Sequence, residues 1–328
     1  MQSASTSQKL MDEFLAAYGR DFEITCGDVM STFFGLQVDH VDQEIHLHMD
    51  NYVEEILREY KEYARKTLRP KKLPIAPNHQ LPRMPPLQAH EREPPTTSIF
   101  RSFMMKLQYA ATWVRFDISF TVSQLASHMS SPGQPHWSAL HHLMEYREQY
   151  PSLRLEYRRG ARTGKELSAY VDSDWGTEIE MRKSISGQVA LFGMTPISWK
   201  SKKQQTIAFS SAEAEYMAVS DFAKEIIYLR SLLASLGFTQ DGPTHVYDDN
   251  TACIEWGNNV IGGREHFAHE AIKNGHLILK KAPTTLQLAD IMTKGVKQPQ
   301  WEMCMVGMLG KPLVPSIQTV VAQEGDDD

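Results

Sequence analysis

Acidic residues stand at four places in the sequence where they could act together. Two end a short apolar segment, two open a long helical pattern, two end a later apolar segment, and one lies in a final helical pattern: Asp172, Asp174, Glu213, Glu215, Asp248, Asp249 and Asp290. Carboxylates gathered from separate elements repel one another unless a cation neutralises them. Mg²⁺ takes oxygen ligands, and two ions about 3.5–4 Å apart suit in-line phosphodiester hydrolysis. The pattern favours a magnesium site, although any one such carboxylate alone is more often a solvated turn residue.

A basic cluster precedes the long helical pattern. It consists of Lys200, Lys202 and Lys203, followed by Gln204. Lysines at the end of a strand could contact phosphates and position a nucleic-acid duplex, and the helix start near Ser211 could add backbone N–H groups. The alternative is an ordinary solvated basic turn.

The elements that must position these residues can be read from residue 165 onward. We expect strands at 168–172, 185–192, 196–200, 245–249 and 277–281, and helices from 211 to Gly237, after 249, and around 286–294. Ser210 and Glu213 fit a capping box at the start of the long helix. The order of three strands, helix, strand, helix, strand and helix predicts an α/β fold with mixed strand pairing.

The first half reads as a smaller α+β region. We expect a helix around 10–18, apolar segments at 33–38 and 44–49, a helix from Asn51 to about Lys66 capped by Asp50, and helices between 103 and 150. Eight of the 17 prolines fall between Pro70 and Pro95, which indicates a linker. The predicted division is 1–66, a linker at 67–98, a helical region at 99–160, an α/β domain at 165–311, and a tail at 312–328.

Several longer motifs make the second half specific. They are Tyr-Val-Asp-Ser-Asp-Trp (170–175), Ser-Ile-Ser-Gly (184–187), Ile-Ser-Trp-Lys-Ser-Lys-Lys-Gln (197–204), Ser-Ser-Ala-Glu-Ala-Glu-Tyr-Met-Ala (210–218), Asp-Asn-Thr-Ala-Cys-Ile (249–254) and Gln-Leu-Ala-Asp-Ile-Met-Thr-Lys (287–294). In sequence and order they resemble the ribonuclease H domain of copia-type LTR retrotransposon Pol polyproteins. This resemblance implies an RNase H-like mixed sheet flanked by helices.

The resemblance also implies an activity and its residues. It assigns Asp172, Glu215, Asp249 and Asp290 as catalytic, metal-binding carboxylates for two Mg²⁺ ions, with Mn²⁺ as a substitute. The implied reaction is endonucleolytic hydrolysis of the RNA strand of an RNA–DNA hybrid, with Lys200, Lys202, Lys203 and Gln204 contacting that hybrid. Glu213 and Glu215 point about 200° apart on a helix, so only one can face the first strand. Asp174, which shares a strand face with Asp172, and Asp248 stay as less favoured candidates.

The first half resembles copia-type reverse transcriptase from just after the palm onward. The motifs are Phe-Phe-Gly-Leu-Gln-Val (33–38), residues 100–109, Arg-Phe-Asp-Ile-Ser-Phe (115–120) and His-Trp (136–137). They imply a thumb-like or connection-like region. Val246 to Asp249 superficially matches the polymerase Tyr-x-Asp-Asp motif but is out of register by one residue. We therefore expect no polymerase active site in this chain, with the polymerase part of a Pol protein as a partner.

Two departures from the family leave a second reading open. The segment 263–270, which contains His266 and His269, is shorter than in the family, and Gly295 follows Lys294 where the family commonly has proline. These departures are consistent with a catalytically inert retroelement remnant that acts at most as a nucleic-acid-binding or scaffold protein. His266, His269 and also His276 are more readily explained as structural or solvated residues.

Composition sets outer bounds on these readings. The 328 residues, 41% of them hydrophobic, are enough for two globular units. A net charge of -6 lacks the basic excess of many nucleic-acid binders, so such a function must rest on local patches. The three cysteines are too scattered for a disulfide framework. Because no apolar run is long enough for a membrane span, we expect an intracellular protein, in a cytoplasmic particle or the nucleus.

Overall fold

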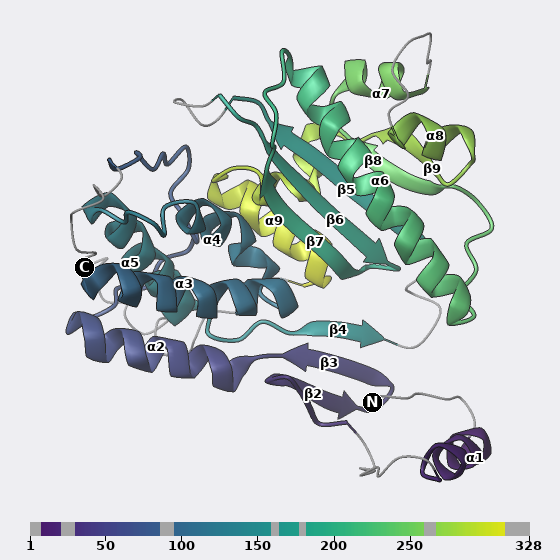
Figure 1. Ribbon diagram of the computed structural model, residues 1–328, viewed down its shortest axis with the longest axis horizontal. Helices are drawn as coiled ribbons and strands as arrows, with labels where there is room; N and C mark the ends of the chain where they lie inside the picture. Colours follow the sequence, from purple (N-terminus) through teal and green to yellow (C-terminus); the bar gives the residue numbers. More distant parts are fainter. Residues whose placement is uncertain are drawn as a thin grey trace, which may run out of the picture.

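Two β-sheets organise the chain. The computed structural model describes residues 8–20, 30–85, 95–158, 164–176, 182–258 and 267–311. Within them, one sheet has the strand order β1-β2-β3-β4 and the other has the order β7-β6-β5-β8-β9 (Figure 1). The predicted tail at 312–328 lies outside the described residues.

The larger sheet is the mixed sheet of an RNase H-like fold. Its strands are β5 (Leu167–Asp174), β6 (Ile185–Phe192), β7 (Thr195–Lys203), β8 (Thr244–Asp248) and β9 (Leu277–Lys281). The first three are antiparallel neighbours, whereas β8 pairs parallel to β5 and β9 parallel to β8. Its helices are α6 (Ser211–Ser235), α7 (Thr251–Asn258) and α8 (Phe267–Lys273). The predicted α/β fold with mixed pairing is confirmed.

The smaller sheet joins distant parts of the first half. Its strands are β1 (Thr32–Phe33), β2 (Leu36–Val41), β3 (Glu44–His48) and β4 (Leu155–Arg158). The helices of this half are α1 (Gln8–Tyr18), α2 (Asp50–Ala64), α3 (Pro95–Trp113), η1 (Phe116–Ile118), α4 (Ser119–Ala126) and α5 (Gln134–Gln149). Because β4 pairs with β3, residues before and after the proline-rich segment share one sheet. The domain boundaries expected from the sequence stay predictions.

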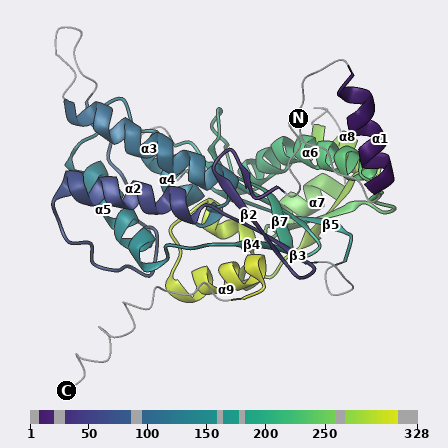
Figure 2. The ribbon, with the colours of Figure 1, turned by 90° about the horizontal axis from the view of Figure 1, so that it is seen from below.

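Opposite faces of the larger sheet pack against different partners. Ala190 on β6 belongs to a core shared with α6, whereas its neighbours Val189 and Leu191 belong to a core shared with α3, α4 and α5. Successive strand residues point to opposite faces of a sheet. The helices of the first half therefore cover the face opposite to the one that packs against α6. Figure 2 shows α2 to α5 gathered on one side and α6 to α8 on the other. The indole of Trp199 on β7 donates to Ala111 O at 2.7 Å across this boundary.

Helix α6 begins and ends as its sequence predicts. Ser210 is the N-cap, and its side chain accepts a hydrogen bond from Glu213 N at 3.1 Å. The Glu213 carboxylate reaches back one residue further than a capping box requires and accepts from Phe209 N at 2.6 Å. Gly237, with φ +84°, follows the helix in the left-handed conformation that favours glycine. The indole of Trp175, directly after β5, donates to Ala208 O at 3.1 Å and holds the start of this helix beside the end of that strand.

Three local predictions were wrong or incomplete. Met49, not Asp50, is the N-cap of α2, because Asp50 is already helical and its carboxylate accepts from Ser152 at 3.0 Å. The segment 33–38 is broken by a turn at Phe34 and Gly35, both with positive φ, so it forms a hairpin of β1 and β2.

The helix expected around 286–294 is also different. It consists of two 3₁₀ turns, η2 (Thr284–Leu286) and η3 (Leu288–Met292), held between Pro283 and the sheet. Short, tightly packed connections commonly take this form. Strand β4 and the helix α9 (Gln298–Leu309) were not predicted.

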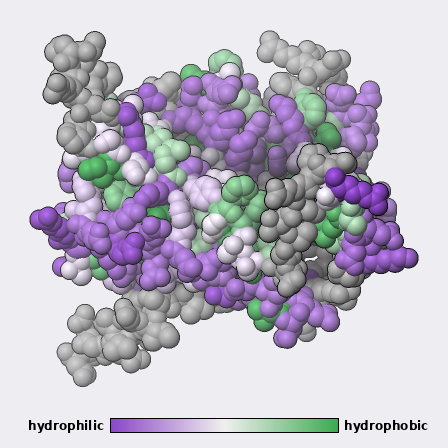
Figure 3. All heavy atoms as spheres, turned by 60° about the horizontal axis from the view of Figure 1, so that its bottom comes forward, coloured by the Kyte–Doolittle hydropathy of each residue, from purple (hydrophilic) through white to green (hydrophobic). Residues whose placement is uncertain are grey.

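The last feature of the fold is the distribution of hydrophobic residues on the surface and along the helices. Figure 3 shows a mostly hydrophilic face with separate hydrophobic patches. Among the helices that the structure describes, none has both the length and the apolar character needed to cross a bilayer.

Candidate active site

Three of the predicted carboxylates converge at one edge of the larger sheet. Asp172 lies near the end of β5, Asp249 directly follows β8, and Glu215 lies in the first turns of α6. Parallel neighbours end at the same edge, and the capped start of α6 is held there. Each residue offers a carboxylate oxygen, and these oxygens lie within 4.8 Å of one another. Because these oxygens are hard ligands at mutual reach, the group fits a divalent cation such as Mg²⁺.

Burial makes this group costly without a cation. Asp172 and Glu215 are 2% and 4% exposed, and Glu215 Oε2 has no hydrogen-bond partner among the described residues. Burial first, and then the carboxylates of Asp172 and Asp248, raise the pKa of Glu215 well above its ordinary value. An unpartnered, buried carboxylate oxygen is expensive unless it is protonated or binds a cation.

Asp248 is the interior neighbour of this group rather than a member of it. It is completely buried, and its Oδ1 accepts from Asn250 N at 2.7 Å. The thiol of Cys253 also lies against this carboxylate. Burial raises the pKa of Asp248 to about 6.

Asp290 lies beside the group and is held by a lysine. Lys294 Nζ is 2.8 Å from Asp290 Oδ1 and 3.4 Å from Asp172 Oδ2, so it bridges the two carboxylates. Gln300 in α9 donates to Asp290 Oδ2 at 3.0 Å. Burial, followed by the Asp172 charge, raises the pKa of Asp290 to about 7, although Lys294 opposes this shift. The ammonium group of Lys294 thus lies between Asp290 and Asp172, and Asp290 is not one of the three carboxylates whose oxygens lie within 4.8 Å of one another.

Gly187 allows η3 to come this close. It is the strand partner of Asp172 on β6. A Cβ atom at Gly187 would lie 2.6 Å from Thr293 Cγ2 and 2.8 Å from Ala289 O, closer than real Cβ contacts. Thr293 in turn donates its hydroxyl to Asp172. The glycine of the Ser-Ile-Ser-Gly motif is thus explained by the approach of the segment that carries Asp290.

Glu213 and Asp174 are placed less favourably for binding a cation with this group. Glu213 is engaged at Phe209 N in the helix cap, which is consistent with its direction opposite to Glu215. Asp174 is partly exposed at the end of β5 and lines a pocket beside Lys294.

The predicted hybrid-contacting residues do not form one surface. Lys200 Nζ is 3.6 Å from Asp221 on α6, and Lys202 is exposed two residues along the same face of β7. Lys203 points to the opposite face by the same alternation. Gln204 differs from the prediction: it is 7% exposed, and its amide donates to Ser186 Oγ at 2.9 Å and to Ala214 O at 2.8 Å. Because its donors are used inside the domain, Gln204 joins β6 to α6 instead of facing solvent.

Sequence reasoning missed Lys294, Thr293 and Gln300 as partners of the carboxylates. The i, i+4 spacing of Asp290 and Lys294 was a usable signal, because such residues face each other across a helical turn. Gln300 gave no such signal, because it lies in a helix that was not predicted. His266 and part of the shortened segment lie outside the described residues, and His269 is in α8.

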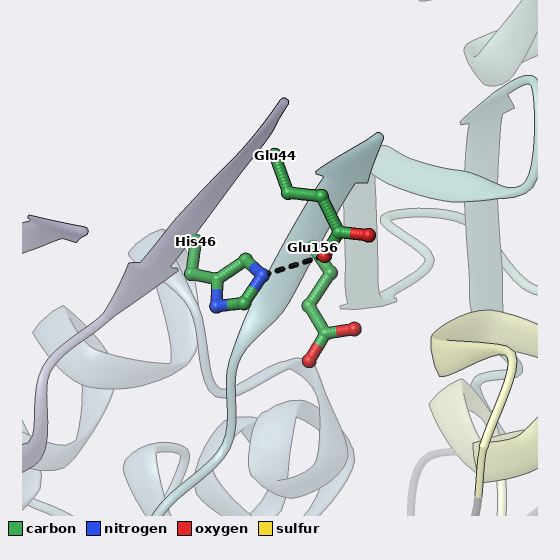
Figure 4. A group of neighbouring side chains, drawn as sticks. All are labelled: Glu44, His46 and Glu156. Atoms are coloured by element: carbon green, nitrogen blue, oxygen red, sulfur yellow. Dashed lines mark hydrogen bonds and ion pairs between the residues drawn. The ribbon is translucent and has the colours of Figure 1, made fainter. Parts of the chain in front are cut away.

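A second group of candidate ligands lies on the smaller sheet. Figure 4 shows Glu44, His46 and Glu156, with the His46 imidazole 2.9 Å from Glu44 Oε2. His46 and Glu156 are strand partners, so the three side chains share one face. Arg158 pairs with both glutamates, at 3.1 Å and 2.9 Å, and Lys311 also pairs with Glu156. These cations already neutralise the carboxylates, so the group is explained as an ion-pair network.

Comparison with known proteins agrees with the motifs. No protein-family model matches the chain. The chain is 30% identical over 293 residues to the retrovirus-related Pol polyprotein from transposon RE2 of Arabidopsis thaliana, covering 87% of this chain and 19% of the relative. It is 29% identical over 301 residues to the polyprotein from transposon RE1 of the same plant, covering 89% of this chain and 20% of the relative.

A solved structure is also similar in part. LC11-RNase H1, isolated from compost, matches with a TM-score of 0.30 and 15% identity, over 40% of this chain and 94% of that one. The chain spans about a fifth of the length of the curated relatives it matches. By sequence, the chain is therefore similar to one part of the retrovirus-related Pol polyproteins of copia-type transposons.

Proposed function

We propose that this chain is a metal-dependent endonuclease that hydrolyses the RNA strand of RNA–DNA hybrids, as the RNase H part of a retrotransposon reverse transcriptase. The observation that carries the proposal is the convergence of Asp172, Glu215 and Asp249 with a buried, unpartnered carboxylate oxygen. The kinship with Pol polyproteins supports the same reaction. The proposed setting is intracellular, beside the polymerase part of a Pol protein.

The residues divide into those that hold the metal and those that orient the site. Asp172, Glu215 and Asp249 would hold Mg²⁺, and Asp290 would contribute to a second ion; Mn²⁺ would substitute. When bound, Mg²⁺ supplies an activated water and stabilises charge on the phosphate and leaving oxygen. Thr293 and Lys294 keep the Asp172 carboxylate in place. Lys202, exposed on β7, is available to a backbone phosphate.

Cleavage of a labelled hybrid tests the proposal. The purified chain is expected to cut the RNA strand with Mg²⁺, and Asp172→Asn or Asp249→Asn is expected to abolish cutting. Asp241→Asn, at an exposed position, is the matched control and should retain activity. Single-stranded RNA should remain uncut. Cleavage that persists in both site variants would contradict the assignment.

A catalytically inert, nucleic-acid-binding remnant is the second candidate. It is favoured by the position of Lys294, whose ammonium group lies between Asp172 and Asp290. This candidate predicts that the folded chain binds the hybrid but does not cut it at any Mg²⁺ or Mn²⁺ concentration. The same assay, accompanied by a binding measurement, distinguishes the two.

A further inference from the structure

Part of the proline-rich segment is fixed along α5. Residues 69–82, here called the strap, make hydrogen bonds to that helix at intervals. Arg69 N donates to Glu145 Oε1 at 3.1 Å, and the imidazoles of His142 and His136 contact the carbonyls of Leu73 and Pro82 at 3.0 and 2.9 Å. These contacts hold the strap in one place, although its composition predicts a linker.

The middle of the strap lies against the RNase H-like part. Ile75 is buried in a small core with Phe120 and Ile185, and Ile185 belongs to β6. A Cβ atom at Gly295 would lie 2.6 Å from Ala76 O, so only glycine admits the strap at this distance. Gly295 stands where the resemblance leads one to expect proline. The departure from the family thus coincides with a contact between the two halves of the chain.

This contact creates a pocket beside the carboxylates. A cavity of about 220 Å³ is lined by Asn78, His79 and Gln80 of the strap together with Phe120, Asp174, Lys294 and Gly295. Asn78, His79 and Gln80 are exposed. Lys294 belongs both to this pocket and to the carboxylate group, since its Nζ is 3.4 Å from Asp172. The pocket and the carboxylate group are therefore neighbours that share Lys294.

We propose that this pocket is a subsite for one ribose-phosphate unit of the RNA strand, next to the bond that is cut. The inference rests on the proposed function. Amide, imidazole and ammonium groups donate to phosphate oxygens, and the Asp174 carboxylate accepts from a hydroxyl. The ribose 2′-OH both donates and accepts, so a pocket with both kinds of partner favours RNA over DNA. The strap, from the reverse-transcriptase side of the chain, thereby completes the nuclease site.

Hybrid binding without turnover tests the subsite. Fluorescence anisotropy of a labelled RNA–DNA hybrid, with Ca²⁺ in place of Mg²⁺, gives the dissociation constant of the full chain. The double variant His79→Ala, Gln80→Ala removes two surface donors and is expected to weaken binding by roughly 5- to 150-fold, because each lost hydrogen bond is worth about 0.5–1.5 kcal/mol. A DNA duplex of the same sequence should lose less. His40→Ala, an exposed histidine on β2, is the control and should bind as the wild type does.

A second variant perturbs the pocket from the other side. Gly295→Ala should push the strap away and weaken hybrid binding in the same direction. Thermal denaturation of each variant shows whether the fold is intact. Unchanged hybrid affinity in both folded variants would overturn the subsite while leaving the proposed nuclease standing. If the wild type neither binds nor cuts the hybrid, the proposed function and the subsite both fail.

Discussion

The buried Asp248 carboxylate should make the metal-free protein lose stability as the pH rises. Asp248→Asn keeps the shape of the side chain and its acceptor for Asn250 N. It removes a charge from a position that is completely buried and adjoins the carboxylate group. We therefore expect the variant to be more stable than the wild type at high pH in the absence of divalent cations.

The size of the effect follows from the pKa of Asp248, which burial raises from 3.8 to about 6. Below pH 3.8 this carboxyl is protonated in both the folded and unfolded states, and the variant gains nothing. As the pH rises, the unfolded chain ionises first, so the wild type progressively loses stability until the pH exceeds the folded pKa. At about 1.4 kcal/mol per pKa unit, a shift of about two units corresponds to about 3 kcal/mol at pH 8.

Urea denaturation in EDTA at pH 4, 6 and 8 measures this difference. The gain in the free energy of unfolding should be about 0.5 kcal/mol at pH 4 and approach about 3 kcal/mol at pH 8. Asp241→Asn, at an exposed position, should show no such trend. A gain that is equal at all three pH values, or a variant less stable than the wild type at pH 8, would refute the reasoning that the buried charge is the cause.

Three further substitutions test supports of the site and of the fold. Gly187→Ala should displace η3 and cost about 1–3 kcal/mol, measured by thermal denaturation, and it should weaken Mn²⁺ binding measured by calorimetry. Asp117→Asn should leave the fully buried Arg115 without its charged partner and cost about 3–5 kcal/mol in urea denaturation; an unchanged midpoint would contradict it. Ser210→Ala should cost about 1 kcal/mol through loss of the α6 cap, whereas Ser210→Asn should restore most of it.

Local signals were sufficient for most of the larger sheet. The predicted bounds of β6 and β9 agree with the structure. Turn glycines delimit both strands, because Gly193 follows β6 and Gly275 precedes β9. The start of α6 was readable from Ser210 and the stop from Gly237, because each signal depends only on neighbouring residues. The pattern of strand ends and one helix start indicated a group of carboxylates, and the family resemblance selected Asp172, Glu215 and Asp249 among them.

Features that depend on contacts between distant residues could not be predicted from the sequence. The segment around Asp290 has helical composition, but its conformation depends on the space above Gly187 on another strand. Gln204 lies in a basic, polar run, and only the packing of β6 against α6 shows that it is buried. Helix α9 did carry a local signal that was overlooked, namely Pro299 near its start and Gly310 in the left-handed conformation at its end.

The pairing of β4 with β3 limits the order in which the parts of this chain can fold. The two strands are separated by the strap and by the helices α2 to α5. Their pairing must close a long loop, and the conformational entropy lost on closure is offset only when apolar residues become buried. Trp301 and Met305 of α9 belong to the same core as α3 and α5, so that core is complete only when nearly all of the described chain is available. During synthesis, the apolar residues of the first half therefore stay partly exposed until α9 has been made and can pack against them. Chaperone binding and slow, high-contact-order folding are the expected costs of this topology.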